Sequence, residues 1–326
     1  MVNWGIIGLG NMGQNFASAI SETNNSNLVG VASLDKNKIK NFINKFNYNN
    51  IKTYNNYEDI IKDKSINAIY IATLNNTHFD LIKRCSENSK NILCEKPITL
   101  NYPEAAKVSD YISKNNVIIY EGFAYRSHPQ TKIIQEIVNS ELEEVISIQS
   151  NFGFKVNRVK TESRLFNKKL GGGVILDVGC YPLSLLNFLY KNNNQYKFLN
   201  AYGSFTETNV EDYAEAEIEI DNKVKCQIKV SFKENYENNT IIEGKKGKLI
   251  INEPWLPGNK TTLEISQGVS YYKKLVNSDL SLYANQIEMV SNNFEKNKKD
   301  DKFLVNINDS LSIMKNLSIW SELIKK

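Results

Sequence analysis

A glycine-rich turn near the N-terminus constrains the fold of this chain more than any other feature. Residues 4–20 read WGIIGLGNMGQNFASAI, in which a short apolar run precedes Gly8, Gly10 and Gly13, and apolar residues then recur at helical spacing up to Ile20. In this order of strand, turn and helix, the first glycine permits the tight turn and the second lets a pyrophosphate approach the backbone. The third lets the helix pack close to its strand. The stretch therefore predicts a dinucleotide site at a helix N-terminus, the alternative being a merely structural turn.

Strands and helices alternate through the first third of the chain. Strands are expected at residues 27–32, 66–72, 91–94 and 117–120, and helices at 36–46, 77–87 and 103–114. This alternation predicts an α/β Rossmann domain with a doubly wound parallel sheet. Ligands bind beyond the carboxyl ends of the strands in such sheets, so the residues directly after each strand are candidates for the site.

From about residue 146 the apolar residues recur with period two. Segments such as AEAEIEI and KVKCQIKVSF alternate apolar with polar residues, and amphipathic helices at 282–294 and 307–324 close the chain. We expect an α+β domain with a large, mostly antiparallel open sheet, whose polar face meets solvent or a second subunit. The predicted domains are 1–122, which binds the dinucleotide, and 123–326, for substrate binding and oligomerisation. The last helix could pack back on the first domain.

The composition is that of a soluble globular protein. Of 326 residues, 41% are hydrophobic and 23% charged, and the length favours two domains. The basic run at 296–302 lacks the interleaved aromatics of a nucleic-acid site, no signal peptide is recognised, and no apolar run is expected to span a membrane. Four cysteines without a CxxC pair and two histidines predict reduced, mostly buried thiols and no metal. We expect a cytoplasmic protein that binds neither nucleic acid nor membranes.

The end of the second predicted strand bears on the choice of cofactor. An NAD enzyme usually keeps an acidic residue there for the ribose hydroxyl, and this chain has Ser33, with Asp35 two positions on. Serine leaves room for a 2′-phosphate, and Lys36 or Lys38 could supply positive charge. NADP is therefore favoured over NAD, although this stretch contains no arginine. Asp35 could instead simply cap the helix that follows it.

Three motifs stand where the two predicted domains meet. They are EKP at residues 95–97, EGFAYRSHPQ at 121–130 and GGGVILDVGCYP at 171–182. In the last, Asp177 and Tyr181 are four residues apart and share a face if the segment is helical. The glycines before them would permit close approach of the backbone to a ligand.

Together these motifs resemble those of the Gfo/Idh/MocA oxidoreductases, over nearly the whole chain. EKP, YRxHP and GGGxxxDxGxY follow the GxGxxG turn in order, and TLNNTH at 73–78 fits the family's TPNxxH, with Leu74 in place of the usual Pro. Many members carry His where this chain has Tyr181. The Tyr version, with GKKGKLIINEPW and DSLSIMKNL, is more similar to the branch containing glucose–fructose oxidoreductase, NADP-linked D-xylose dehydrogenase and dihydrodiol dehydrogenase. The resemblance implies hydride transfer between a nicotinamide and a sugar or polyol carbon, in a homodimer or larger homo-oligomer.

The residues themselves suit this chemistry. Removal of hydride from a carbinol carbon requires the hydroxyl proton to leave, so a base must lie near that oxygen. Free tyrosine, with a pKa of about 10, is a poor base at neutral pH. A nearby lysine ammonium stabilises the phenolate and lowers that pKa. We therefore assign Tyr181 as the acid/base and Lys96 as its electrostatic partner, which also orients the substrate hydroxyl. Asp177 would position Lys96 or bind a substrate hydroxyl.

The expected site is larger than these three residues. The cofactor site is expected to comprise Gly8, Gly10, Asn11, Met12, Gly13, Ser33, Leu34, Lys38, Thr73, Asn75, His78, Glu95 and Lys96. The substrate site would comprise Lys96, Arg126, His128, Asp177 and Tyr181. His78 is expected to shape the nicotinamide side rather than to act as a base, and His128 could merely hydrogen-bond a loop.

Two alternatives to a sugar dehydrogenase stay open. One is an oxidoreductase of dihydrodiols or other non-sugar carbonyls. The other is a dinucleotide-binding sensor or assembly protein without turnover, against which the retention of Lys96, Asp177 and Tyr181 argues.

Overall fold

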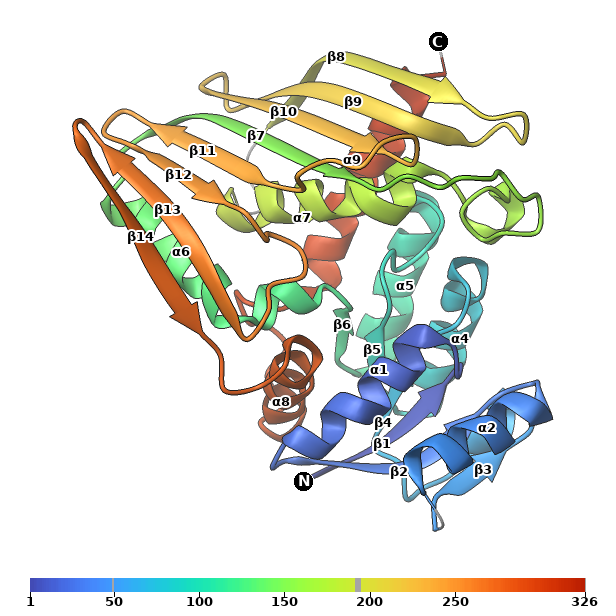
Figure 1. Cartoon of the computed structure of the whole chain (residues 1–326). Coiled ribbons are helices and arrows are strands. Elements are labelled where there is room, and N and C mark those ends of the chain that lie inside the picture. Colours follow the sequence, from blue (N-terminus) through green and yellow to red (C-terminus); the bar gives the residue numbers. More distant parts are fainter. Residues whose placement is uncertain (49, 191–194, 326) are drawn as a thin grey trace. The chain divides into compact units, whose positions relative to one another are not determined.

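The computed structural model describes residues 1–48, 50–190 and 195–325, which form two compact units (Figure 1). Unit 1 comprises Met1–Ser127 with Leu280–Ser310, and unit 2 comprises His128–Asp279 with Leu311–Lys326. Each unit contains one sheet. The chain therefore leaves unit 1 after Ser127 and returns to it for residues 280–310. The boundary at residues 122/123 stays a prediction.

The sheet of unit 1 has seven strands in the order β15-β6-β5-β4-β1-β2-β3. Strands β1 to β6 are parallel, and β15 is antiparallel to β6. The strand order reverses between β1 and β4, as in the doubly wound sheet that the sequence predicts. The strands are β1 (Val2–Ile7), β2 (Ser26–Ala32), β3 (Lys52–Tyr54), β4 (Ala68–Ile71), β5 (Asn91–Cys94), β6 (Ile119–Glu121) and β15 (Val305–Asn306).

Helices cover both faces of this sheet. They are α1 (Asn11–Ala19), α2 (Lys36–Phe46), α3 (Tyr57–Lys62), α4 (His78–Glu87), α5 (Tyr102–Asn115) and α8 (Leu282–Glu295). Helices α1, α2 and α8 share one core with Trp4 and Tyr70. Phe16 of α1 stacks on Tyr70 with ring centroids 4.3 Å apart, and Trp4 donates its indole N–H to Ser291 of α8 at 3.0 Å. The sequence analysis does not predict β3 or α3, which are short elements.

The sheet of unit 2 has eight strands in the order β14-β13-β12-β11-β7-β10-β9-β8. Only the pair β7 and β10 is parallel among its described pairings, which confirms a mostly antiparallel sheet. The strands are β7 (Val145–Gly153), β8 (Tyr196–Phe205), β9 (Glu211–Ile220), β10 (Val224–Ser231), β11 (Thr240–Gly244), β12 (Lys248–Ile251), β13 (Lys260–Gln267) and β14 (Ser270–Asn277).

Helices of unit 2 lie against one face of this sheet (Figure 1). They are α6 (Pro129–Ser140), α7 (Cys180–Leu189) and the part of α9 (Ile307–Leu323) that follows Ser310. Trp320 of α9 donates its indole N–H to the Glu215 carbonyl of β9 at 3.1 Å. The opposite face is polar, because the side chains of Glu215 and Glu217 alternate with the buried Ala214 and Ala216 along β9.

One helical run among the described residues, Lys168–Leu189, is long and apolar enough to cross a membrane. The sequence analysis expects no such run. However, 83% of its most apolar window is buried within the protein, and the core helix of a globular domain meets the same criteria. All four cysteines are buried thiols that form no disulfide, as the sequence predicts.

Candidate functional site

The glycine turn has the geometry that a dinucleotide requires. Gly8 has φ +99°, and a Cβ there would lie 2.5 Å from the Ala72 carbonyl oxygen. A Cβ on Gly13 would lie 2.1 Å from the Gly8 carbonyl oxygen, so strand and helix approach as closely as the sequence predicts. A Cβ on Gly10, by contrast, would meet nothing within 4 Å. The backbone of Gly10 therefore offers open space of the kind that a pyrophosphate approaches.

The N-terminus of α1 completes this cradle. Gln14 donates the first helical hydrogen bond to the Gly10 carbonyl at 3.0 Å, so the N–H groups of the turn before it, including those of Asn11 and Met12, precede the helical ladder. The first turn carries no acidic side chain. The partial positive charge of the helix end thus favours phosphate, and the residues present fit a dinucleotide.

The turn after β2 is organised by two side chains. The buried Ser33 hydroxyl accepts the Asp35 N–H at 3.1 Å. Asp35 caps α2, because its carboxylate accepts the N–H groups of Asn37 at 2.9 Å and Lys38 at 3.4 Å. The capping alternative for Asp35 is therefore confirmed. Leu34 is exposed, and the place of Ser33, Leu34 and Lys38 beside a ribose phosphate stays a prediction.

The loops that follow β4 and β5 are tied together by His78. The fully buried imidazole lies with Nδ1 2.9 Å from the Pro97 carbonyl oxygen and Nε2 3.3 Å from that of Thr73. Burial lowers the pKa of His78, so the ring is neutral and donates to one carbonyl at a time. The buried Asn75 begins a 3₁₀ turn in the first of these loops. This arrangement suits His78 to shaping the site rather than to proton transfer.

The EKP motif lies directly beyond β5, as the sequence predicts. Glu95 is buried and accepts the Tyr70 hydroxyl at 2.5 Å, which links the motif to the ring that stacks on α1. Lys96 is partly exposed. Two residues later, the Ile98 N–H donates to the Glu121 carboxylate at 2.8 Å. Glu121 is a residue of the site region to which the sequence analysis gives no role.

Arg126 and His128 make contacts that hold the backbone. Arg126 is 1% exposed and donates through Nη2 to the Lys302 carbonyl at 2.7 Å. His128 is buried at the N-terminus of α6, where its Nδ1 accepts the Gln130 N–H at 3.1 Å. Burial lowers the pKa of His128, which therefore caps the helix as a neutral ring. These contacts favour the loop-bonding alternative for His128, and a substrate contact by either residue stays a prediction.

Asp177 and Tyr181 lie on one continuous helical segment in unit 2. Residues Ile175–Gly179 form a π turn, and α7 follows from Cys180. Asp177 is 4% exposed, and its Oδ1 accepts Nη1 of Arg164 at 2.7 Å. The sequence analysis missed Arg164. Arg164 could have been predicted from the chemistry of Asp177. A carboxylate on an apolar helical segment needs a cation, and Arg164 lies in the loop before the glycines.

The ring of Tyr181 is partly exposed and packs against two aromatic side chains. Its centroid lies 5.3 Å from that of Phe152 at 72°, and 5.8 Å from that of Trp255 at 53°. Trp255 in turn donates its indole N–H to the Asn151 carbonyl at 3.4 Å. The aromatic neighbours restrict the ring orientation of Tyr181, and neither was predicted as part of the site.

The glycines before Asp177 make room for neighbouring protein atoms. Gly173 has φ +118°, and a Cβ there would lie 2.4 Å from Oε1 of Glu211. That oxygen also accepts the Ile175 N–H at 3.3 Å, so the Glu211 carboxylate lies at the start of the helical segment. A Cβ on Gly172 would lie 2.8 Å from the Leu165 carbonyl oxygen. Close approach of this backbone to a ligand stays a prediction.

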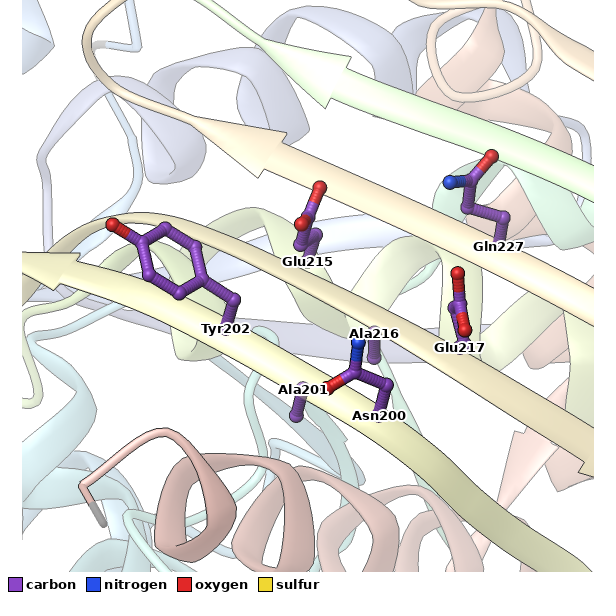
Figure 2. A pocket seen from close by; sticks show the side chains of 7 residues that line it. All are labelled: Asn200, Ala201, Tyr202, Glu215, Ala216, Glu217 and Gln227. Atoms are coloured by element: carbon purple, nitrogen blue, oxygen red, sulfur yellow. The ribbon is translucent and has the colours of Figure 1, made fainter.

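A shallow hollow on the polar face of unit 2 is not this site. Figure 2 shows its lining, which comes from the neighbouring strands β8, β9 and β10: Asn200, Ala201, Tyr202, Glu215, Ala216, Glu217 and Gln227. The two carboxylates among them would repel a pyrophosphate. None of the predicted site residues lines it.

The structure thus groups the predicted residues by unit. In unit 1 the glycine turn, the loop after β4 and the EKP motif stand beyond the carboxyl ends of adjacent strands, with His78 joining two of the loops. In unit 2 the helical segment brings together Asp177 and Tyr181. Lys96 belongs to the first group, and its partnership with Tyr181 stays a prediction.

Comparison with known proteins matches the two parts of the chain to two family models. A model of an oxidoreductase family with an NAD-binding Rossmann fold, GFO_IDH_MocA, matches residues 2–123, and one of the GFO/IDH/MocA C-terminal domain matches 131–250. The trans-1,2-dihydrobenzene-1,2-diol dehydrogenase of Xenopus tropicalis is 30% identical over 78% of this chain and 76% of its own length. The D-xylose 1-dehydrogenase (NADP(+)) 2 of Haloferax volcanii is 39% identical over 40% of each chain.

Solved structures share the fold. A 3-ketoreductase from Actinomadura kijaniata in complex with NADP and TDP-benzene superposes with a TM-score of 0.89 at 18% identity, covering 99% of this chain and 97% of its own. An aldose–aldose oxidoreductase from Caulobacter crescentus gives the same TM-score of 0.89, identity of 18% and coverage of 99% and 97%. With both family models matched and a relative 30% identical over most of its length, the chain belongs to the Gfo/Idh/MocA family of oxidoreductases.

Proposed function

We propose that this protein transfers hydride between NADP or NAD and the carbinol or carbonyl carbon of a sugar or polyol. The observation that carries the proposal is the glycine turn, where Gly8 has φ +99° and the space beside Gly10 is open. Family membership and the dehydrogenase relatives support a redox reaction at a hydroxyl-bearing carbon.

The cofactor would be held by the backbone around Gly10 and by the N-terminus of α1, with Thr73 and Asn75 bordering it. When bound, the nicotinamide accepts or supplies the hydride. NADP is favoured because Ser33 replaces the acid that would bind a ribose hydroxyl and repel a phosphate. The xylose dehydrogenase relative, whose name includes NADP(+), supports the same choice.

The proton would be handled by Tyr181. As the phenolate, it takes the proton from the substrate hydroxyl during oxidation and returns it during reduction. The ammonium of Lys96 would stabilise the phenolate and hydrogen-bond the substrate oxygen. The buried carboxylate of Asp177, paired with Arg164 at 2.7 Å, would accept a second substrate hydroxyl or orient Lys96.

A second candidate substrate is a dihydrodiol. Diol dehydrogenase relatives match 78% of this chain, whereas the xylose dehydrogenase matches 40%. Oxidation of a dihydrodiol would use the same proton transfer at one of two adjacent hydroxyls, so the two candidates differ in the surroundings of the carbon and not in the chemistry.

We further propose a cytoplasmic homodimer or larger homo-oligomer formed through the polar face of the unit 2 sheet. This face carries the exposed side chains of Tyr202, Tyr271 and Leu275 among its charges. Light scattering at working concentration is expected to give at least twice the chain mass. A monomer there would contradict the proposal.

The test of the function begins with titration of the purified protein with NADPH and NADH. Nicotinamide absorbance is then followed during a screen of aldoses, polyols and trans-dihydrodiols. In Tyr181→Phe we expect kcat to fall about 100-fold or more, with cofactor Kd within about threefold, because only proton transfer is lost. Activity in Tyr181→Phe equal to that of the wild type would contradict the acid/base assignment. Binding without turnover on any substrate would favour the sensor.

A further inference from the structure

Glu121 is a buried acidic residue that the proposed chemistry leaves without a role. It ends β6 and is 1% exposed. In the sheet it stands in register with Cys94 of β5 on one side and Val305 of β15 on the other. Burial of a carboxylate is costly unless hydrogen bonds satisfy it, so its contacts indicate what it holds.

The two carboxylate oxygens contact two different segments of unit 1. Oε1 accepts the Ile98 N–H at 2.8 Å, and Oε2 accepts the Ser310 hydroxyl at 2.6 Å. Ile98 lies two residues after Lys96, and Ser310 lies in the first turn of α9. The carboxylate therefore bridges the loop that carries Lys96 to Ser310, which lies 189 positions after Glu121 in the chain.

The loop that carries Lys96 depends on such contacts because it lies outside the sheet. The chain from Lys96 to Asn101 has no helix or strand, so its backbone groups find partners on side chains. His78 contacts the Pro97 carbonyl at 2.9 Å, and Glu121 contacts the next residue through its N–H. The Pro97–Ile98 peptide unit is thus held at both ends, at its carbonyl oxygen by His78 and at its N–H by Glu121.

We propose that Glu121 is a positioning residue for Lys96, acting through the backbone amide of Ile98. The inference rests on the proposed function, in which the Lys96 ammonium serves Tyr181 and the substrate oxygen. A displacement of about 1 Å in a catalytic group can cost about 100-fold in rate, so a fixed backbone two residues away matters for the reaction.

Charge near Glu121 agrees with this placement. The pKa of Glu121 is raised to about 7, mainly by burial and also by the neighbouring Glu95 carboxylate, while the hydrogen bonds from Ser310 and Ile98 and the Lys96 ammonium act to lower it. The Lys96 ammonium therefore acts electrostatically on the carboxylate that holds its own loop.

The first arm of the test needs no substrate. In the full-length protein, Glu121→Leu removes the acceptor of the Ile98 N–H. Hydrogen exchange measured by mass spectrometry on peptides that resolve Ile98 is expected to speed up about tenfold or more. Glu121→Gln restores an acceptor of the same shape, and exchange at Ile98 should return to within about threefold of wild type. The control is Ser291→Ala, which removes a buried hydrogen bond with Trp4 elsewhere in unit 1 and should leave Ile98 exchange unchanged.

The second arm measures turnover. We expect Glu121→Leu to lower kcat about 10- to 100-fold while the Kd for NADPH stays within about threefold, and Glu121→Gln to recover most of the loss. Unchanged Ile98 exchange in Glu121→Leu, or faster exchange with wild-type kcat, would overturn the inference. A parallel loss of NADPH affinity would also overturn it, because that indicates a general loss of structure. If the wild-type protein turns over no substrate, the proposed function fails, and Ile98 exchange still decides whether Glu121 holds the loop.

Discussion

Both units use a buried glutamate to hold the segment that carries predicted catalytic residues, but they hold different kinds of segment. In unit 1, Glu121 binds one amide of an irregular loop, and His78 must bind the neighbouring carbonyl. In unit 2, Glu211 binds the Ile175 N–H at the start of a helical segment that forms its own backbone hydrogen bonds from there on. A helix leaves only its terminal groups unpaired, and Glu211 accepts one N–H at such an end. A loop has no backbone ladder, so its peptide groups depend on side chains such as His78 and Glu121.

The two glutamates also differ in what makes room for them. Glu211 lies so close to the backbone that position 173 must be glycine, with φ +118°. Glu121 reaches its amide from a regular strand. The helix of unit 2 is thus fixed by steric fit, and the loop of unit 1 by hydrogen bonds and charge. Substitutions beside Glu211 and at Glu121 test this contrast.

The largest effect is expected from Gly173→Ala. The new Cβ would lie 2.4 Å from Oε1 of Glu211 and would occupy a backbone conformation that disfavours side chains. Strain and overpacking together should lower the free energy of unfolding of unit 2 by about 4 kcal/mol, measured by urea denaturation. Gly268→Ala is the matched control, because Gly268 has φ +56° and nothing within 4 Å of its Cβ position. It should cost about 1 kcal/mol. Equal losses of unfolding free energy in the two variants would show that the Glu211 side chain moves aside at little cost.

A smaller effect is expected from Glu121→Gln, and it depends on pH. The pKa of Glu121 is raised to about 7 in the folded protein from the ordinary 4.5. The folded state therefore binds the proton more tightly, and this contribution to stability is present below pH 4.5 and is lost as pH rises through 7. The wild type should lose about 3 kcal/mol relative to Glu121→Gln over this range, measured as the difference between their unfolding free energies at each pH. Parallel stability curves would contradict a titrating Glu121.

The smallest effect is expected from Arg164→Met. The variant leaves the Asp177 carboxylate buried without its 2.7 Å partner, but the Arg164 side chain is 49% exposed, so solvent screens part of the loss. We expect a cost of about 1 kcal/mol in urea, together with a fall in kcat if Asp177 contacts substrate. Arg158→Met, an exposed position in the same loop, is the control and should change neither quantity. If Arg158→Met lowered the unfolding free energy as much as Arg164→Met, the Arg164–Asp177 ion pair would not be the cause of the loss.

The sequence predicted the elements whose pattern is long and periodic. Helix α2 and strand β5 have the predicted bounds, because caps and apolar runs mark them locally. The edge strand β3 was missed because a three-residue strand such as KTY shows no periodicity. Within the site, the glycine turn was predictable because its constraint lies in the backbone of consecutive residues. Arg164, Glu121 and Glu211 were not, because their partners stand 13, 23 and 36 positions away in sequence and only the tertiary fold brings them together.

The return of residues 280–310 to unit 1 has a consequence for synthesis on the ribosome. The indole of Trp4 has its hydrogen-bond partner Ser291 on α8, 287 positions later in the chain, and Ala284, Ile287 and Val290 complete the core around it. Translation must therefore pass through nearly all of unit 2 before the first-made sheet can bury that face. Throughout that interval the nascent chain exposes an apolar surface beside Trp4, and transiently exposed surface of this kind makes a folding chain prone to aggregation.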